Sequence, residues 1–473
     1  MNPKPQPAEK SVCIHGHFYQ PPREDPWTGV IAAQPSAAPF HDWNARVAAE
    51  CYGPNAAARI LDEAGKLLAE RNNFERISFD FGPTLLSWME ANAPDIYGAV
   101  LAADRVAHGA VAQAYSHMIL PLANARDRQT QVHWGSQDFR SRFGREPEGM
   151  WLPETAVDMA ALDALAAAGI RFTILAPRQA KRVRAFGGHR WQDVTGARID
   201  TRHVYEVRLP SERRIAVFFY DAGLAQAVAF EGLLRDGHRL AERLANGFDE
   251  SSAGSQLVSV ATDGESYGHH HKFGEMALAS ALRFLEARGD IHITNYRAFL
   301  ATHPPAHEVE IIENSSWSCE HGIERWRSDC GCNSGGAPNV NQAWRAPMRD
   351  SLNWLRDQIA PAYAEAAERL VRDAWAARND YIDVLLDGSP ASRAAFLNRH
   401  QLHPLDVADA DRVWRLLELQ RFAMLMFTSC GWFFDEITGI EATQNLAYAQ
   451  RAMELAQETL GLSVSAEFAR RLG

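Results

Sequence analysis

The sequence of 473 residues predicts an α/β fold, an irregular seven-stranded parallel (β/α) barrel followed by an α-helical C-terminal domain. Through the first 300 residues, short apolar runs alternate with helical patterns, which is typical of βα units. The apolar runs are continuous, as expected for parallel strands buried on both faces. Beyond about residue 346 only amphipathic helical periodicity remains. Seven runs predict strands: Val12–Phe18, Arg76–Phe81, Ala110–Ser116, Gly149–Pro153, Arg171–Ala176, Arg214–Tyr220 and Gln256–Thr262.

Helical periodicity fills most of the gaps between these runs. The clearest predicted helices are Asn55–Arg71, Thr84–Ala91, Ala156–Ala168 and Glu275–Ala287, with Pro361–Leu386 and Asp411–Phe427 in the C-terminal part. We therefore expect a disordered leader (1–10), a catalytic barrel (11–304), a loop segment that lines the substrate (305–346) and a helical domain (347–473).

The composition bounds the partners and the compartment. A net charge of −11 argues against nucleic acid or an anionic membrane as a partner, whereas a neutral polysaccharide meets no such penalty. The N-terminus carries no apolar run resembling a signal peptide, and no run of roughly 18 apolar residues occurs. These observations predict a cytoplasmic protein with reduced cysteines, and they leave its oligomeric state open.

Two predicted strands end in a carboxylate, and barrel enzymes carry their chemistry at the C-terminal ends of the strands. Glu154 follows Pro153 and precedes a helix start, where an anion is stabilised, so it suits a nucleophile. Asp263 suits a general acid if its surroundings raise its pKa. Cleavage of a glycosidic bond uses such a pair. Glu265 could support Asp263 or hold a sugar hydroxyl, and helix capping is the alternative role for Glu154.

Polar side chains gather at other strand ends. His15 and His17 share one face of the first strand, with Gln20 shortly after. Tyr115 and His117 share a face at the end of the third strand. These residues, together with Trp151 and Tyr267, are predicted to contact the substrate. A metal held by the histidines, or a purely structural role for them, are the alternatives.

A loop after the barrel holds Cys319, His321, Cys330 and Cys332 in the spacing C-x-H-x8-C-x-C. Structural zinc sites usually use wider cysteine pairs, so we expect this spacing to strain a tetrahedron and predict no metal here. We instead predict a loop in which Trp326 stacks on sugar. The break around Thr428–Trp432 indicates that the helices close over the barrel, with Trp432 either a second sugar platform or a packing residue.

Taken together, these motifs resemble glycoside hydrolase family 57. His15-Gly-His17, with Gln20 after an inserted Phe18-Tyr19 pair, resembles its first block, and Tyr115 with His117 the second. Trp151-Leu-Pro-Glu154 resembles the nucleophile block, and Asp263-Gly-Glu265-Ser-Tyr-Gly268 the acid/base block. The helical part resembles that of a subgroup in which this domain has no known function.

The resemblance implies a retaining hydrolase or transglycosylase acting on α-glucan, with Glu154 as nucleophile, Asp263 as acid/base and no obligatory metal or cofactor. Amylase, 4-α-glucanotransferase, branching and α-galactosidase activities stay open. Two other classes remain as alternatives. One is a metal-dependent carbohydrate deacetylase that uses His15, His17 and His117. The other is a glucan-binding protein without catalysis.

Overall fold

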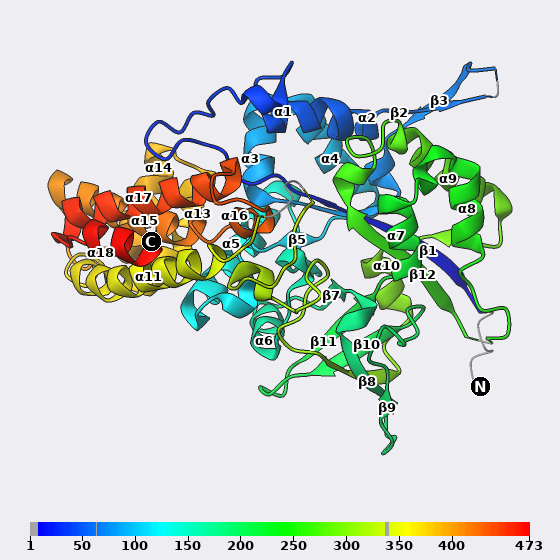
Figure 1. Cartoon of the computed structure of the whole chain (residues 1–473). Helices are drawn as coiled ribbons and strands as arrows, with labels where there is room; N and C mark the ends of the chain where they lie inside the picture. Colours follow the sequence, from blue (N-terminus) through cyan, green and yellow to red (C-terminus); the bar gives the residue numbers. More distant parts are fainter. Residues whose placement is uncertain (1–7, 63, 253, 336–339) are drawn as a thin grey trace.

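The structure is a computed structural model that describes residues 8–62, 64–252, 254–335 and 340–473. The helical domain lies on the left in Figure 1, the barrel on the right and an extension of the barrel sheet at the bottom. Among the described residues, none of the helices is both long and apolar enough to cross a membrane. Residues 1–7 of the predicted leader lie outside the described residues.

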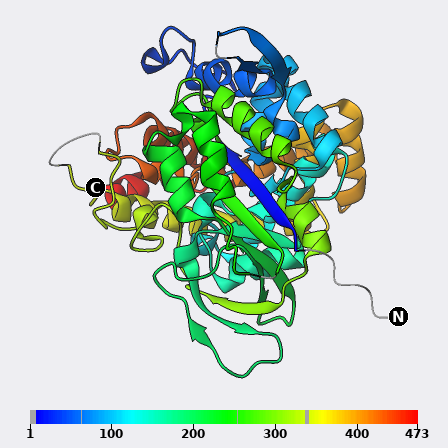
Figure 2. The same ribbon diagram turned by 90° about the vertical axis from the view of Figure 1, so that its right-hand side faces the viewer.

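Seven parallel strands form the barrel, in the order β12, β1, β4, β5, β6, β7 and β11. Ladders or single bridges connect each neighbouring pair, and Figure 2 shows β1 in blue beside β12 in green. A hydrogen bond from Asp221 N to Ser259 O, 2.8 Å, links the segment after β11 to β12. Each strand overlaps one predicted run, so the predicted fold is confirmed. The bounds are β12 Gln256–Asp263, β1 Lys10–Phe18, β4 Ser78–Phe81, β5 Ala112–Gln113, β6 Met150–Trp151, β7 Phe172–Leu175 and β11 Arg214–Phe219.

The strands are continuous apolar runs because both faces are covered. All four residues of β4 are buried, and so are the last eight of β1. Close packing at the strand ends requires glycine at one point, since a Cβ on Gly264 would lie 2.2 Å from the Phe18 ring. That glycine separates Asp263 from Glu265, so the Phe18 ring packs between the two acidic positions.

Helices cover the outside of the barrel, and side chains fix where several of them begin. The predicted helix Ala156–Ala168 starts only at Met159, because the Asp158 carboxylate accepts from Ala161 N and caps it. The helices of this part are α1 Trp43–Val47, α2 Gly53–Ala56, α3 Pro83–Asn92, α4 Pro94–Ala107, α5 Ala125–Phe143, α6 Met159–Ala167, α7 Ala222–Phe230, α8 Gly237–Ala245, α9 Gly274–Arg288 and α10 Tyr296–Thr302.

The predicted helix Asn55–Arg71 is wrong. Only α2 is helical there, and the rest is the hairpin of β2 (Ala58–Leu61) and β3 (Leu67–Arg71) that projects at the upper right in Figure 1. The Asp62 carboxylate accepts from the N–H groups of Ala64 and Lys66, and this turn reverses the chain.

A second departure is a mixed, mostly antiparallel extension of the barrel, which the sequence did not predict. It continues the sheet from β11 in the order β10, β14, β8, β9. Its strands are β8 Ala180–Ala185, β9 Gln192–Asp193, β10 Val204–Arg208 and β14 His307–Ile311, while β13 His292–Ile293 pairs with the start of β1. The segment 305–346 therefore contributes a strand before it becomes loop.

The C-terminal part is helical. The predicted helix Pro361–Leu386 is interrupted, because the Asp373 carboxylate caps a new helix at Ala374. The second hydrophobic core includes Met118, Trp134 and Ala156, so these helices pack directly on the barrel segment. The helices are α11 Arg345–Ala367, α12 Ala374–Asp380, α13 Ile382–Leu386, α14 Pro390–His400, α15 Val407–Leu425, α16 Cys430–Phe433, α17 Ile440–Leu460 and α18 Ser465–Leu472.

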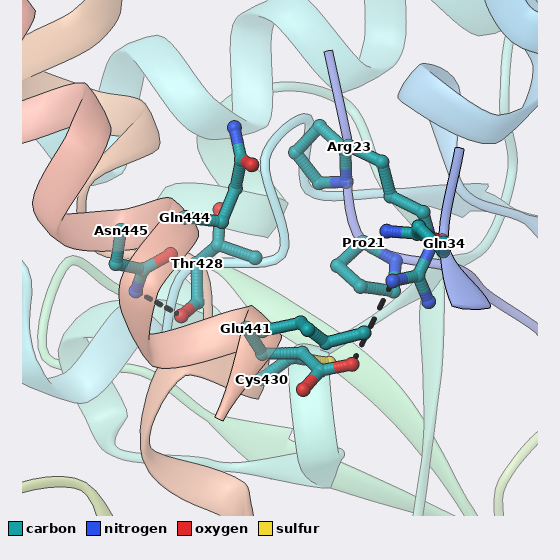
Figure 3. A pocket seen from close by; sticks show the side chains of 10 residues that line it. Pro21, Arg23, Gln34, Thr428, Cys430, Glu441, Gln444 and Asn445 are labelled. Carbon is teal, nitrogen blue, oxygen red and sulfur yellow. Dashed lines mark hydrogen bonds and ion pairs between the residues drawn. The ribbon is translucent and has the colours of Figure 1, made fainter. Parts of the chain in front are cut away.

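The loop after β1 reaches across to the helical domain. Figure 3 shows Arg23 of this loop facing Glu441 of α17, with 3.7 Å between the charged groups. Gln444 donates to the carbonyl of Glu24 at 2.8 Å. The cavity between the loop and α17 is only about 10 Å³, room for roughly one water molecule. These contacts fix α16 and α17 beside the C-terminal ends of the strands.

Candidate active site

Strand register brings three charged side chains to one level of the barrel. His17 of β1 is paired with Asp80 of β4 on one side and with Asp263 of β12 on the other. All three stand at or near the C-terminal ends of their strands, where the loops also converge. The barrel therefore places a cation between two carboxylates at the position where catalysis is expected.

His17 and Asp80 form a buried ion pair. The His17 Nδ1 atom lies 2.8 Å from an Asp80 carboxylate oxygen, and both side chains are buried. Burial opposes the charged form of His17, but the Asp80 carboxylate outweighs it and raises the pKa of His17 to about 9. Burial likewise opposes the charge of Asp80, whose pKa is nevertheless held below its ordinary value by His17 and His15.

A chain of hydrogen bonds leads from this ion pair to the helical domain. His17 Nε2 lies 3.2 Å from Nε2 of His117, and Nδ1 of His117 lies 2.5 Å from the hydroxyl of Ser429. Burial, and then the positive charge of His17, hold the pKa of His117 well below its ordinary value. A neutral His117 accepts a hydrogen bond from the charged His17 and donates one to Ser429. Tyr19 stacks on His117 with ring centroids 3.8 Å apart.

Glu154 has an unusual backbone and two donors. Its φ of 58° and the 48° of Thr155 are left-handed, which is strained for a β-branched threonine. The Gln179 amide bonds both the hydroxyl and the carbonyl of Thr155, so this conformation is held from outside. The Glu154 carboxylate accepts from the indole N–H of Trp317 at 3.1 Å and from the Ser318 hydroxyl at 2.6 Å. Both groups donate to the same carboxylate oxygen of Glu154.

The two acidic groups on the other side, Asp263 and Glu265, have raised pKa values. The Asp263 side chain is open to solvent, yet the surrounding protein removes much of its hydration. This desolvation, with the charges of Glu154 and Asp80, outweighs His17 and raises the pKa of Asp263 to about 6. Glu265 is buried, and desolvation raises its pKa to about 7 although it accepts from the Tyr52 hydroxyl at 2.6 Å. The site therefore combines a Glu154 carboxylate that accepts two hydrogen bonds with an Asp263 whose pKa is raised.

Several predicted contacts lie behind the site surface. His15, Trp151 and Tyr267 are at most 1% exposed, so they support the site from within rather than contact a ligand. His15 bonds Asp80, and the Trp151 ring stacks on His17 with centroids 4.8 Å apart. Gln20 accepts a hydrogen bond from Arg23 at 2.9 Å, within the loop that follows β1.

The remaining aromatic predictions also need correction. Trp326 and Trp432, predicted as sugar platforms, are both fully buried and offer no face to a sugar. The guanidinium of Arg349 lies 3.8 Å from the Trp432 ring centroid, and its Nε donates to the Trp326 carbonyl. Tyr115 packs edge-on against Trp134 at the junction with the helical domain.

The sequence reasoning missed Asp80, Tyr52, Trp317 and Ser318. Asp80 carried a signal, because a carboxylate inside the apolar run Ser78–Phe81 requires a buried partner. Trp317 lies on the predicted substrate loop, but the sequence analysis predicts Trp326 of that loop as the residue that stacks on sugar. Trp317 and Ser318 open onto a depression of about 530 Å³.

The histidines at the strand ends are bound into a hydrogen-bond network. His17 and His117 are bonded to Asp80, to each other and to Ser429, so their ring nitrogens are engaged. In the part of the chain that the structure describes, potential metal-ligand atoms converge in one group, formed by Cys319, His321, Cys330 and Cys332.

Comparison with known proteins agrees with this geometry. The model of glycosyl hydrolase family 57 matches residues 40–312, more than half of the chain. The chain belongs to glycosyl hydrolase family 57. A domain of unknown function, DUF3536, matches residues 340–473 and covers the helical domain of this family 57 chain.

Solved structures show the same fold at low sequence identity. An exo-type maltose-forming amylase from Pyrococcus sp. ST04 has a TM-score of 0.74 and 16% identity, over 98% of this chain and 82% of its own. A family 57 branching enzyme from Pyrococcus horikoshii has a TM-score of 0.59 and 14% identity, over 98% and 94%. A 4-alpha-glucanotransferase from Thermococcus litoralis has a TM-score of 0.57 and 15% identity, over 95% and 60%.

In sequence, the Alpha-amylase 1 of Dictyoglomus thermophilum is 28% identical over 100 residues. That match spans 21% of this chain and 15% of the relative, so it covers only a small part of either protein.

Proposed function

We propose that this family 57 chain is a retaining α-glucan enzyme, a hydrolase or transglycosylase, in which Glu154 is the nucleophile and Asp263 the acid/base. The observation that carries the proposal is the difference between the two carboxyl groups. Glu154 accepts hydrogen bonds from Trp317 and Ser318, whereas desolvation and negative neighbours raise the pKa of Asp263 to about 6. Retaining glycosidases need this asymmetry.

The roles follow from the protonation states. Ionised Glu154 attacks the anomeric carbon and forms a glycosyl-enzyme, while protonated Asp263 donates its proton to the leaving oxygen. Asp263 then takes a proton from water, which gives hydrolysis, or from a sugar hydroxyl, which gives transfer. His17 moderates the pKa of Asp263 from the neighbouring strand.

The retaining geometry requires the two carboxyl groups to be roughly 5–5.5 Å apart. The contribution of Glu154 to the raised pKa of Asp263 supports a close approach. The choice of α-glucan rests on the amylase, glucanotransferase and branching enzymes that share the fold. A reducing compartment such as the cytoplasm is part of the proposal, and the six cysteines, all free thiols, support it.

The test is a product analysis with maltoheptaose, in which chain lengths, linkages and the anomer first released are followed. Glu154→Gln is the inactive control. Glu320→Gln is the matched control, since Glu320 is exposed on the same loop and has no role in the mechanism.

Transfer gives both longer and shorter chains, hydrolysis only shorter ones, and branching new α-1,6 linkages. Each result must disappear in Glu154→Gln. Release of the β-anomer first, or full activity of Glu154→Gln, would refute the retaining mechanism with this nucleophile.

A further inference from the structure

Four ligand-type side chains outside the catalytic carboxylates converge on one point. The ligand atoms of Cys319, His321, Cys330 and Cys332 all lie within 4.8 Å of one another. Cys319 is buried, Cys330 and Cys332 are half-buried, and His321 is exposed, along the depression below Trp317 and Ser318. Three thiols and an imidazole are a ligand set that proteins use for structural zinc.

The distances fit a single tetrahedral ion. Zinc–sulfur bonds of about 2.3 Å place two sulfurs about 3.8 Å apart, and a zinc–nitrogen bond of about 2.0–2.1 Å places sulfur and nitrogen about 3.6 Å apart. The Cys319 sulfur lies 3.9 Å from that of Cys330 and 3.7 Å from that of Cys332. The Cys332 sulfur lies 3.6 Å from Nδ1 of His321.

Other uses of the thiols fit these distances less well. A disulfide needs sulfurs about 2.05 Å apart, far closer than any pair observed here. An iron–sulfur cluster holds its cysteines wider apart, because several iron atoms lie between them. The spacing is that of ligands around one ion.

Backbone geometry explains how a one-residue spacing can serve a tetrahedron, against the expectation from the sequence. Gly331, between Cys330 and Cys332, adopts a left-handed φ of 79°, and Gly322, just after His321, a φ of 83°. A left-handed residue turns the chain so that the side chains on both sides of it can face one point. Gly331 supplies such a turn between Cys330 and Cys332, and Gly322 turns the chain directly after His321.

The surroundings suit a negatively charged centre. Three thiolates, a neutral imidazole and one Zn²⁺ carry a net charge of −1. The fully buried Arg345 lies with Nη1 3.9 Å from the Cys330 sulfur and donates to the Cys332 carbonyl at 2.9 Å. A buried cation beside a thiolate favours the deprotonated sulfur that metal binding requires.

We propose that Cys319, His321, Cys330 and Cys332 bind one structural Zn²⁺ that fixes the loop carrying Trp317 and Ser318. Binding displaces the three thiol protons to solvent. All four positions around the ion are filled by protein ligands, so the ion organises the loop and takes no part in bond cleavage. Cys319 directly follows Ser318, and the ion thereby holds the two donors of Glu154 in place. The site itself does not depend on the proposed catalytic roles.

The experiment measures metal in the full chain, purified under reducing conditions, by mass spectrometry of total elements. We expect one zinc per chain, and its loss in Cys330→Ser and in Cys332→Ser. Cys430→Ser is the matched control, because Cys430 is also half-buried but lies outside the cluster. Circular dichroism checks that each variant is folded.

Cobalt gives a readout that needs no variant. Metal-free wild-type protein titrated with Co²⁺ should reach saturation at one equivalent, with the intense visible bands of a tetrahedral cobalt thiolate. Octahedral cobalt bands, a disulfide among these cysteines, iron with inorganic sulfide, or zinc retained in both folded cysteine variants would each overturn the proposal.

Discussion

The Ser318 hydroxyl donates to the Glu154 carboxylate at 2.6 Å, across 164 positions of the sequence. Glu154 stands at a strand end of the barrel, while Ser318 belongs to the loop that follows the barrel. Trp317 adds a second donor from the same loop at 3.1 Å. The carboxylate of the proposed nucleophile is therefore held by hydrogen bonds from a segment outside the seven strands.

Removing these donors should weaken catalysis without removing the carboxylate. A hydrogen bond to a charged group contributes roughly 1.5–3 kcal/mol, so Ser318→Ala and Trp317→Phe should each lower kcat/KM by roughly 10- to 100-fold. Ser328→Ala on the same loop is the control, because Ser328 bonds only Glu324. Steady-state kinetics on maltoheptaose measures the effect, and wild-type values in both variants would contradict the assigned role of the donors.

The raised pKa of Asp263 predicts the basic side of the pH profile. The general acid must be protonated, so kcat/KM should fall as the pH rises through about 6. His17⁺ lowers the pKa of Asp263, hence His17→Gln should move this fall to higher pH even though total activity drops. The test is to measure kcat/KM of the wild type and of His17→Gln between pH 4 and 9. A fall at the same pH in both would show that His17 does not act on Asp263.

The strands and the two carboxylates at their ends could be read from the sequence, because buried parallel strands are continuous apolar runs that end at the site. The partner of a buried charged side chain could not be predicted from the sequence. Asp80 signals a partner, but nothing local says that this is His17, since strand register decides it. Trp326 and Trp317 differ by nine positions on one loop, and only packing shows that Trp326 is buried and Trp317 half-exposed.

Glycine conformation limited the interpretation of the cysteine loop. The C-x-H and C-x-C spacings argue against a tetrahedral site if every residue has an ordinary backbone. The left-handed φ of Gly331 removes that argument, and a left-handed φ is not visible in the sequence. The hairpin found in place of the predicted helix Asn55–Arg71 also depends on a local turn. There the Asp62 carboxylate accepts backbone hydrogen bonds, and the resulting turn overrides the helical periodicity.

The His17–Asp80 pair predicts a pH dependence of stability. The pKa of His17 is raised from 6.5 in the unfolded chain to about 9 in the folded protein. The stabilisation from this shift is fully present below pH 6.5 and is lost as the pH rises through 9. Asp80→Asn removes the carboxylate that raises the pKa, so its free energy of unfolding should vary less between pH 6.5 and 9 than that of the wild type.

Urea denaturation followed by circular dichroism at several pH values measures this difference. Asp411→Asn is the control, because Asp411 pairs only with Arg415 at the exposed surface and should leave the pH dependence unchanged. Equal slopes for wild type and Asp80→Asn would show that the buried pair does not form in solution.

A second buried pair joins the helical domain to the barrel. Arg378 of α12 lies 2.7 Å from the carboxylate of Asp127 on α5 and donates to Thr130 at 2.7 Å. Replacing only the cation strands a buried carboxylate, so Arg378→Met should lower the free energy of unfolding by about 3–5 kcal/mol. The double variant Arg378→Met/Asp127→Asn should recover part of the loss, because it removes the stranded charge.

The exposed pair Glu365–Arg369 on and just beyond α11 provides the comparison, with 2.7 Å between its charged atoms. Solvent screens such a pair, so Glu365→Gln should change the free energy of unfolding by no more than about 0.5 kcal/mol. Urea unfolding of all four proteins at one pH tests both statements. If Arg378→Met were as mild as Glu365→Gln, the helical domain would be held on the barrel by its apolar contacts alone, and Met118, Trp134 and Ala156 would carry the junction.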